Sequence, residues 1–360
     1  MTATTVSEQA ALDETLQPVD VIASSSLANA GLMQLVVGHY STQVLTMLAQ
    51  TGVLDALGDG RLAATELAEP LGLDPRALHR LLRAGATLRV LDHHGDETFT
   101  ITDTGHFMRS DYPFSMASLA KVQGMPWHWQ PWTHAVDALR NGRSFSEAHE
   151  DRGFYEYLQG HPGATAAYAA AMNDLAQQGQ LLALPLHDWS GYDTVIDIAG
   201  GEGSVLLAAL EQKPDAKGIL FDLPEVAARF QPDGHPHPAA SRVAAAGGDM
   251  FEAVPAGGDC YVLSMVVNDH DDEHVSRLLR NVHGAMRPGG TLVVLDMTLP
   301  APGTPSFASL VDIECLVVSG GVCRTEEQLR TLLAEAGFSL RCTRRGISPV
   351  CVHEADWRDR

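Results

Sequence analysis

The chain has 360 residues, of which 45% are hydrophobic and 19% charged, a composition typical of a globular protein with room for two domains. Its 24 Lys and Arg against 45 Asp and Glu give a net charge of -21, which argues against binding to nucleic acid or to an anionic membrane surface, since both attract cationic side chains. No membrane span, secretory signal or CxxC pair of cysteines is found in the sequence. We therefore expect a soluble cytoplasmic protein without disulfides or structural zinc.

The pattern of residues along the chain predicts four segments. Residues 1–25 are polar and aperiodic, and are expected to form a flexible tail. The segments that follow are a helical unit with a winged-helix pattern (26–112), a helical linker (113–185), and a segment of alternating strands and helices (186–360).

The second segment has the pattern of a winged helix. Apolar residues recur at helical spacing from about 26 to 57, two short helices follow with a turn at Gly72–Pro75, and alternating residues around Phe99 then predict a small hairpin. Because the net charge is strongly negative, we expect this unit to serve packing and dimerisation rather than DNA binding. The stretch 32–57 is too apolar to stay uncovered on a monomer, so the sequence predicts a homodimer.

The third segment is helical and rich in aromatic residues. Such a cluster between two domains can be a packed core or can form the wall of a pocket for a flat ligand, and the sequence leaves both interpretations open. The rings concerned are Trp127, Trp129, Trp132, Phe145, Phe154, Tyr155, Tyr157 and Tyr168.

The fourth segment alternates strand-like and helical stretches from Tyr192 onward. This order predicts βαβ units, that is, an α/β fold whose mostly parallel sheet has helices on both faces. The last two strands are joined too closely for a crossover helix and are expected to form an antiparallel hairpin. Pro349 in the last strand predicts either a bulge or a late start of that strand.

A glycine-rich turn opens this segment and is the strongest local signal for a ligand. Residues 197–204 (DIAGGEGS) lie directly after a predicted strand and before a helix, and Asp222 ends the next strand 19 positions after Gly203. A carboxylate at that place can accept hydrogen bonds from both hydroxyls of a ribose. The combination predicts an adenosine-containing cofactor, although the loop alone does not exclude a nicotinamide dinucleotide.

Further motifs follow in order: FDLP at 221–224, GDMF at 248–251, NDHDD at 268–272, and PGG at 288–290 before a strand that contains the acid Asp296. This series resembles the S-adenosylmethionine-dependent small-molecule O-methyltransferases of the plant caffeate and bacterial polyketide-tailoring type. The resemblance covers nearly the whole chain. It implies that residues 186–360 form a Rossmann-like class I methyltransferase domain, which binds S-adenosylmethionine and has a seven-stranded sheet whose last strand is antiparallel. Residues 26–112 would be the family's winged-helix dimerisation domain, and 113–185 would be a helical linker and substrate lid.

The resemblance also implies roles for individual residues. The cofactor's methionine part, ribose and adenine would be contacted by residues in or near the motifs above. These residues are Asp197, Gly200, Gly201, Gly203, Asp222, Leu223, Asp249, Met250, Phe251 and Ser264. The substrate would be contacted by Met172, Trp127, Asn268 and Cys323, although Met172 could equally be a core residue and Cys323 a core or pocket-wall residue.

Three positions depart from the family's pattern. Ala199 replaces the first loop glycine, which is tolerable if its φ is negative. Asn268 replaces the catalytic histidine, and of the two acids that orient that histidine, Asp296 remains while Cys323 replaces the other. Because an amide is not a base at pH 7, either the acceptor hydroxyl ionises unaided or Asp269 or His270 accepts its proton.

The sequence thus predicts an S-adenosylmethionine-dependent methyltransferase that acts on a phenolic or enolic hydroxyl of an aromatic natural product. The alternative keeps the fold and cofactor but performs C- or N-methylation, or non-methylating tailoring such as hydroxylation or decarboxylation. A degenerate, DNA-binding regulator is a third possibility that the net charge disfavours. We expect no metal, because the acids beside His270 and His274 are explained by capping of a helix start.

Overall fold

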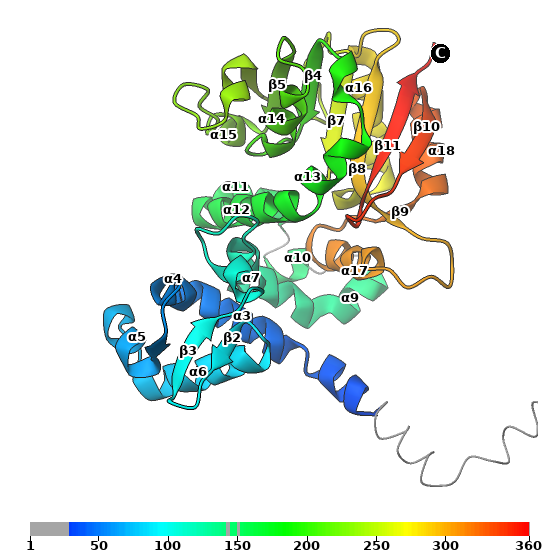
Figure 1. Cartoon of the computed structure of the whole chain (residues 1–360). Helices are drawn as coiled ribbons and strands as arrows, with labels where there is room; N and C mark the ends of the chain where they lie inside the picture. Colours follow the sequence, from blue (N-terminus) through cyan, green and yellow to red (C-terminus); the bar gives the residue numbers. More distant parts are fainter. Residues whose placement is uncertain (1–28, 142–144, 150–151, 360) are drawn as a thin grey trace, which may run out of the picture.

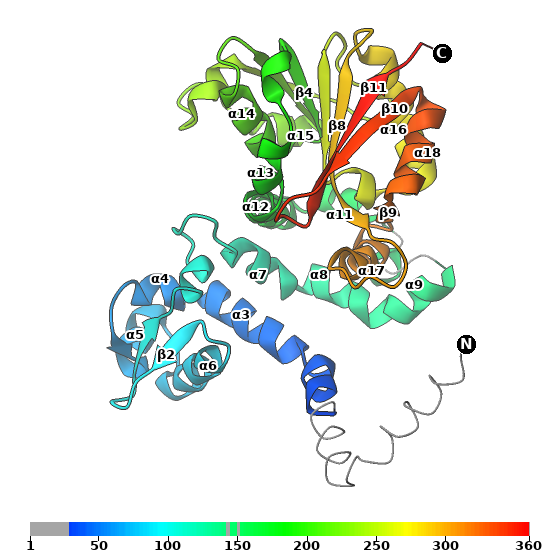
Figure 2. The same ribbon diagram turned by 45° about the vertical axis from the view of Figure 1, so that its right-hand side comes forward.

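The computed structural model describes residues 29–141, 145–149 and 152–359; the tail expected over 1–25 lies outside these ranges. The described chain has a small N-terminal unit, a layer of helices, and a large α/β unit (Figures 1 and 2). None of the described helices is both long and apolar enough to cross a membrane.

The N-terminal unit combines helices with a short antiparallel sheet. Its helical parts are residues 29–36, α3 (His39–Thr51), α4 (Val53–Leu57), α5 (Ala64–Leu71) and α6 (Pro75–Thr87), and its strands are β1 (Leu62–Ala63), β2 (Leu91–His93) and β3 (Thr98–Ile101) in the order β1-β3-β2. The turn before α6 follows from its sequence: the side chain of Asp74 accepts a hydrogen bond from the N–H of Ala77, and Pro75 occupies the first turn, where no N–H is needed. The predicted helix–turn–helix and hairpin are confirmed.

Helices then connect the two units. α12 (Pro162–Gln178) packs against α7 (Ala117–Gln123), and the buried Asp174 of α12 accepts hydrogen bonds from the N–H groups of Ser118 and Leu119 at 2.7 and 3.0 Å. These N–H groups belong to the first turn of α7, where a carboxylate is favourable. The other helices between β3 and β4 in the chain are η1 (Gly105–Met108), α8 (Pro126–Trp129), η2 (Gln130–His134), α9 (Ala135–Asn141), α10 (Phe145–Ala148), α11 (Phe154–Gly160), α13 (Gln180–Ala183), η3 (Leu184–Leu186) and η4 (Trp189–Gly191).

The C-terminal unit is built on one twisted sheet. Its strands are β4 (Thr194–Ile198), β5 (Lys217–Asp222), β6 (Val243–Gly247), β7 (Cys260–Ser264), β8 (Thr291–Leu299), β10 (Phe338–Arg344) and β11 (Val350–Trp357), in the order β10-β11-β8-β7-β4-β5-β6. The pairs from β6 to β8 are parallel, whereas β11 runs antiparallel to both of its neighbours. The predicted seven strands with an antiparallel last strand are confirmed for the described residues.

Two details of the strands, β9 and the start of β11, add to the sheet predicted from the sequence. A two-residue strand that was not predicted, β9 (Arg324–Thr325), pairs with the end of β8 just before α18 (Glu326–Ala336). β11 starts at Val350, directly after Pro349, so the expected late start is confirmed, and the irregularity in the hairpin lies on β10 between Leu340 and Cys342.

Helices cover both faces of this sheet, as predicted. Side chains alternate along β4, so that Val195 packs with α14 (Ser204–Glu211) on one face, while Ile196 and Ile198 pack with α16 (Asp272–Ala285) and α18 on the other. The remaining elements of the unit are α15 (Pro224–Ala227), η5 (Pro238–Arg242), η6 (Val267–Asp269) and α17 (Ala308–Val318).

The order of the strands determines where a ligand can bind. The chain proceeds from β4 outward through β5 and β6, and then returns to form β7 on the other side of β4. A crevice forms where the strand order reverses, outside the carboxyl ends of such strands, and this is the usual ligand site of open α/β sheets.

Candidate functional site

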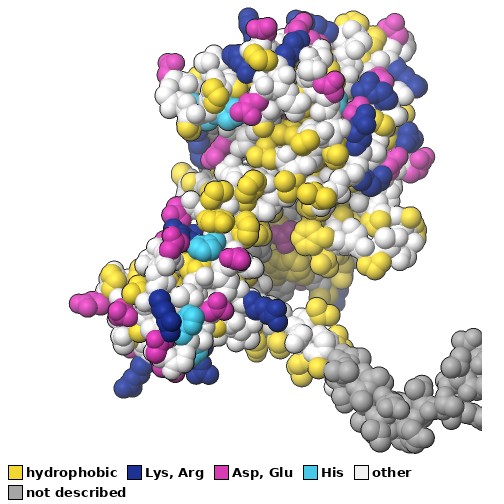
Figure 3. All heavy atoms as spheres, in the orientation of Figure 1, with side chains coloured by type: hydrophobic (Ala, Val, Ile, Leu, Met, Phe, Trp, Pro, Cys, Tyr) yellow, Lys and Arg dark blue, Asp and Glu magenta, His cyan; other side chains and the backbone are white. Residues whose placement is uncertain are grey.

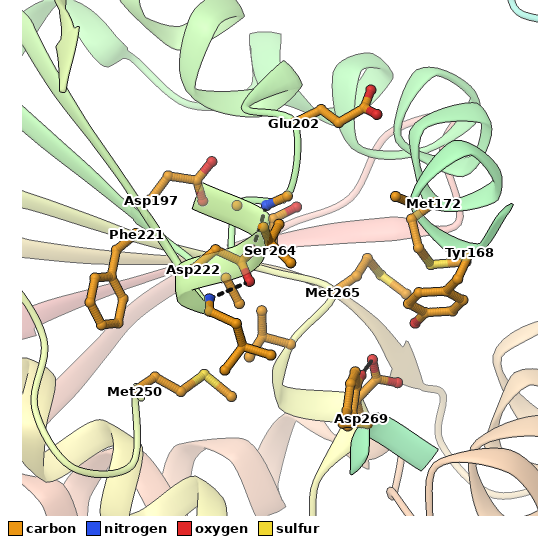
Figure 4. A pocket seen from close by; sticks show the side chains of 18 of the residues that line it. Tyr168, Met172, Asp197, Glu202, Phe221, Asp222, Met250, Ser264, Met265 and Asp269 are labelled. Carbon is orange, nitrogen blue, oxygen red and sulfur yellow. Dashed lines mark hydrogen bonds between the residues drawn. The ribbon is translucent and has the colours of Figure 1, made fainter. Parts of the chain in front are cut away.

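A cavity of about 390 Å³ lies at this reversal point. Its walls come from the loops that follow β4, β5, β6 and β7, and from α11 and α12 on the opposite side (Figure 4). The predicted site residues in its wall are Met172, Asp197, Gly200, Gly201, Asp222, Leu223, Asp249, Met250, Phe251, Ser264, Asp269 and His270.

The turn after β4 brings the backbone close to the cavity. Gly201 and Gly203 have φ of +59° and +81°, which glycine adopts readily, and a Cβ at Gly200 would lie 2.6 Å from an oxygen of Asp197. Gly203 caps α14 and lies just outside the cavity wall.

Ala199 does not have the negative φ under which a side chain would be tolerated here, because its φ is +55°. A side chain with a Cβ is strained in that region by about 1–2 kcal/mol. The strained turn is held by a hydrogen bond of 2.7 Å from the N–H of Ala199 to the carbonyl of Phe221 on β5.

Asp197 presents an unusual carboxyl group to the cavity. The residue is 1% exposed, and neither carboxylate oxygen has a hydrogen-bond partner among the described residues. Burial, together with the nearby charge of Asp222, raises the pKa of Asp197 to about 8. The Ser264 hydroxyl, at the end of β7, also lacks a partner there. Unpaired buried polar atoms in a cavity wall leave room for hydrogen bonds to a ligand.

Asp222, by contrast, is held firmly. One of its oxygens accepts from the N–H of Gly201 at 2.8 Å, and the other accepts from the N–H of Leu223 at 2.7 Å (Figure 4). Burial raises the pKa of Asp222, and these two hydrogen bonds oppose that rise. Each oxygen keeps a further lone pair, which can accept a hydrogen bond from a diol.

The loop after β6 forms the next part of the wall. Asp249 accepts a hydrogen bond from the N–H of Phe251 at 2.8 Å, and the carbonyl of Met250 accepts from the side-chain amide of Asn281 on α16 at 2.9 Å. These contacts fix a loop whose apolar side chains, Met250 and Phe251, face the cavity and suit a flat ring.

The other end of the cavity is formed by sulfur-containing and aromatic side chains. In Figure 4, Met172 and Tyr168 of α12 and Met265, which follows β7, gather on one side. Sequence reasoning missed Met265, whose φ of +54° is exceptional for a bulky residue. Nothing in the sequence indicated this conformation.

Asp269 is the acid best placed at this end. Its carboxylate accepts a hydrogen bond of 2.6 Å from the Tyr155 hydroxyl of α11, 114 positions away. Burial raises the pKa of Asp269 to about 6; the Tyr155 hydrogen bond lowers this pKa and Glu314 raises it further.

The aromatic cluster of the third segment forms both a pocket wall and a packed core, the two interpretations that the sequence left open. Tyr155 and Tyr168 line the cavity, while Phe145 and Phe154 are core residues.

His270 lies beside Asp269 in the wall. Its ring lies edge-to-face against Phe251, with centroids 5.0 Å apart, and tilted at 5.6 Å from the ring of Tyr155. Burial lowers the pKa of His270 to about 4, so the imidazole is neutral at pH 7.

Asn268, Asp296 and Cys323 lie one layer behind the wall. The side-chain N–H of Asn268 points to Cys315 Sγ and Asp269 Oδ1, both at 3.5 Å, and its side-chain oxygen has no partner among described residues. Asp296 does not orient the Asn268 side chain, because its carboxylate accepts from the backbone N–H groups of Asn268 and Met297. The prediction that Asn268 and Cys323 contact substrate is therefore not supported by the geometry: both are at least 96% buried and absent from the wall.

The expected substrate contact of Trp127 is not supported either. Its ring is 8% exposed and packs with Phe154 and Tyr157, with ring centroids 6.2 and 6.5 Å away. The helical spacing of the aromatic residues did not reveal which rings face inward.

The acids near His274 have the capping role that was expected. Asp271 accepts a hydrogen bond of 2.9 Å from the N–H of His274 at the start of α16, and 2.7 Å separate its carboxylate from His274 Nδ1.

Comparison with known proteins agrees with the fold and the cavity. An O-methyltransferase domain model matches residues 129–339, and an O-methyltransferase dimerisation domain model matches residues 33–111. The chain is 36% identical to the 3-amino-4-hydroxybenzoate 4-O-methyltransferase of Streptomyces cremeus (88% of this chain, 87% of the relative) and 32% identical to the phenazine O-methyltransferase PhzM of Lysobacter antibioticus (90% and 95%).

A solved structure of the mitomycin 7-O-methyltransferase MmcR is similar over 93% of this chain and 99% of that one, with a TM-score of 0.83 and 31% identity. Related structures contain S-adenosylmethionine or its demethylated product, S-adenosylhomocysteine. The chain belongs to the O-methyltransferase family, and it is an enzyme that uses S-adenosylmethionine.

Proposed function

We propose that this enzyme methylates a phenolic or enolic hydroxyl of an aromatic natural product, with Asp269 as the proton acceptor. The observation that carries the proposal is one cavity with two different ends. One end has the glycine turn, Asp197 and Asp222, and the other has Asp269 between aromatic and thioether side chains.

The residues at the first end suit S-adenosylmethionine. Asp222, fixed by two backbone N–H groups, can accept both ribose hydroxyls. The unpaired oxygens of Asp197 and the unpaired Ser264 hydroxyl can bind the polar amino-acid end, and Met250, Phe251 and Leu223 can enclose the adenine. When bound, the cofactor supplies a methyl group on a sulfonium, which is a very good leaving group.

The chain's own residues then have two tasks at the other end. The first is to hold the acceptor oxygen in line with the methyl group, because displacement requires near-attack geometry. The walls formed by Tyr155, Tyr168, Met172 and Met265 suit a flat aromatic ring.

The second task is to remove the hydroxyl proton. Asp269 has a pKa of about 6, so its carboxylate is largely ionised at pH 7 and yet basic enough to accept a proton. His270 is neutral but, with a pKa of about 4, is the weaker base. We assign Asn268 a positioning role behind Asp269, because its amide N–H points toward that carboxylate.

The alternative of C- or N-methylation or non-methylating chemistry is not favoured. The family model and the relatives reported above are named as O-methyltransferases. The relative from Streptomyces cremeus acts on a hydroxybenzoate, which is the class of acceptor proposed for this chain.

We also propose that the enzyme is a cytoplasmic homodimer that does not bind nucleic acid, with boundaries near residues 112 and 185. The dimer is supported by the match to a dimerisation domain and by the apolar side chains on the helical residues before α3 (Figure 3). Leu35 in this segment is 79% exposed. The net charge of -21 supports the absence of nucleic acid, and the five free cysteines suit a reducing compartment.

The function is tested by incubating the purified chain with methyl-labelled S-adenosylmethionine and a panel of hydroxybenzoates, hydroxynaphthoates and matched aromatic amines. We expect label in the products of hydroxylated acceptors, with one S-adenosylhomocysteine formed per methyl transferred. Labelling of the amines alone, or transfer to carbon, would contradict the proposal.

A further inference from the structure

A second cluster of ligand-type side chains lies in the N-terminal unit, outside the cavity wall. It consists of His79 on α6, His93 at the end of β2, and Glu97 in the turn before β3. We propose that these three residues form a binding site for a divalent transition-metal ion of the Zn²⁺ type, which fastens the β2–β3 hairpin to α6.

The distances between the ligand atoms support this proposal. His79 Nε2 and His93 Nε2 lie 3.3 and 3.2 Å from the same oxygen, Glu97 Oε2, and all three atoms lie within 4.8 Å of one another. In a tetrahedral zinc site with bonds of about 2.0–2.1 Å, neighbouring ligand atoms are separated by about 3.3–3.4 Å. Two of the three separations therefore already match, and the third, between the two Nε2 atoms, is at most 4.8 Å.

Both imidazole rings are positioned by one buried ring. His93 stacks on Phe99 with centroids 4.5 Å apart and planes 8° apart, and His79 meets Phe99 edge-to-face at 5.6 Å. Phe99 is completely buried in the core of the unit. Since the rings are already held in place, an ion has little ordering of side chains to impose.

The donor set determines the kind of ion. Two imidazole nitrogens and one carboxylate oxygen suit Zn²⁺ and its neighbours rather than Mg²⁺ or Ca²⁺, which take oxygen ligands. The histidine side chains are 29% exposed and that of Glu97 is 66% exposed, so water can complete the coordination. Because the ligands come from one helix and both ends of the hairpin turn, the ion would cross-link these elements without touching the cavity.

The sequence did not predict this site. The sequence predicted no structural zinc because it has no CxxC pair, and no metal at His270 and His274 because the acids there cap a helix; the spacing of 79, 93 and 97 matches no zinc motif either. Only the fold brings the three side chains together.

The test uses the full chain after treatment with a chelator and its removal. Titration calorimetry with Zn²⁺ alone is expected to show one ion per chain at this site, with an affinity at least tenfold weaker in His93→Phe and in Glu97→Gln. His93→Phe keeps a ring stacked on Phe99 and removes only the ligand. His94→Gln, an adjacent histidine whose Nε2 contacts Thr100 instead, is the matched control and should bind as the unchanged chain does.

Co²⁺ gives a second readout, because its visible absorption is strong in a tetrahedral site and weak in an octahedral one. The strong band is expected in the unchanged chain and in His94→Gln, and is expected to be lost in both ligand variants. S-adenosylhomocysteine binding should be the same in all four proteins, which shows that the variants are folded. Equal Zn²⁺ affinity in the unchanged chain and His93→Phe, or no saturable binding, would overturn the proposal.

Discussion

Replacement of Asp269 by asparagine tests the assignment of the proton acceptor. Asparagine has the same shape and can still accept the hydrogen bond from the Tyr155 hydroxyl, so the change removes the basicity and keeps this contact. A general base contributes about 10²–10⁴-fold to a rate. We therefore expect Asp269→Asn to lower kcat by about 100-fold or more, equivalent to about 2.7 kcal/mol of barrier.

The pH dependence follows from the pKa of Asp269. The base is active when ionised, so kcat/KM of the unchanged enzyme should rise with pH and level off above the pKa of about 6. Tyr155→Phe removes a hydrogen bond that stabilises the ionised carboxylate, so the pKa of Asp269 should rise and the inflection should move to higher pH.

The assay is methyl transfer to one identified acceptor, measured from mildly acidic to alkaline pH. Glu273→Gln is the control, because this acid lies exposed in the first turn of α16, outside the cavity wall, and its loss should leave both rate and profile unchanged. If Asp269→Asn kept the rate and the pH profile of the unchanged enzyme, Asp269 would not be the base. His270 would then be the base, or the acceptor would ionise without a protein base.

Three further predictions concern stability and assembly. Ala199→Gly should raise the free energy of unfolding by about 1 kcal/mol in chemical denaturation, since glycine removes the strain of a φ of +55°; an unchanged or lower value would show that the turn is not strained. Because the pKa of Asp197 is raised to about 8 in the folded state, its carboxyl ionises in the unfolded chain but stays protonated in the cofactor-free fold between about pH 4 and pH 8. The fold therefore loses stability as pH rises through this range, so Asp197→Asn should raise Tm at pH 8 and leave it little changed at pH 4. The same variant should bind S-adenosylhomocysteine at least tenfold more weakly; a lower Tm at pH 8 together with normal binding would refute this account of Asp197. Leu35→Arg should shift the sedimenting species from a dimer toward the 38.6 kDa monomer, whereas Ile347→Arg, at a side chain 92% exposed in the other unit, should not; a dimer in both would exclude the helical residues before α3 from the interface.

The parts predicted correctly from the sequence are those that depend on local patterns. The period of apolar residues, the glycines of the turn and the position of Asp222 after a strand are properties of short segments. They placed the strands, the order of helices and strands, and the cofactor end of the cavity. β9, with only two residues, is too short to have a period of its own.

The substrate end could not be predicted in the same way, because it depends on contacts between distant segments. The hydrogen bond between Tyr155 and Asp269 joins residues 114 positions apart. It shows that Asp269, rather than its neighbour Asn268, faces the cavity. The direction of the Trp127 ring and the place of Asn268 behind the wall are likewise set by packing. The left-handed backbone of Ala199 and Met265 is imposed by hydrogen bonds to neighbouring strands, against the preference of both residues.

The central claim is that the cavity at the β4 and β7 ends holds the cofactor through Asp222. Calorimetric titration of the cofactor-free chain with S-adenosylhomocysteine tests it most directly. We expect one site per chain with a micromolar dissociation constant, weakened at least tenfold in Asp222→Ala. No binding to the unchanged chain, or equal binding to both proteins, would contradict the account.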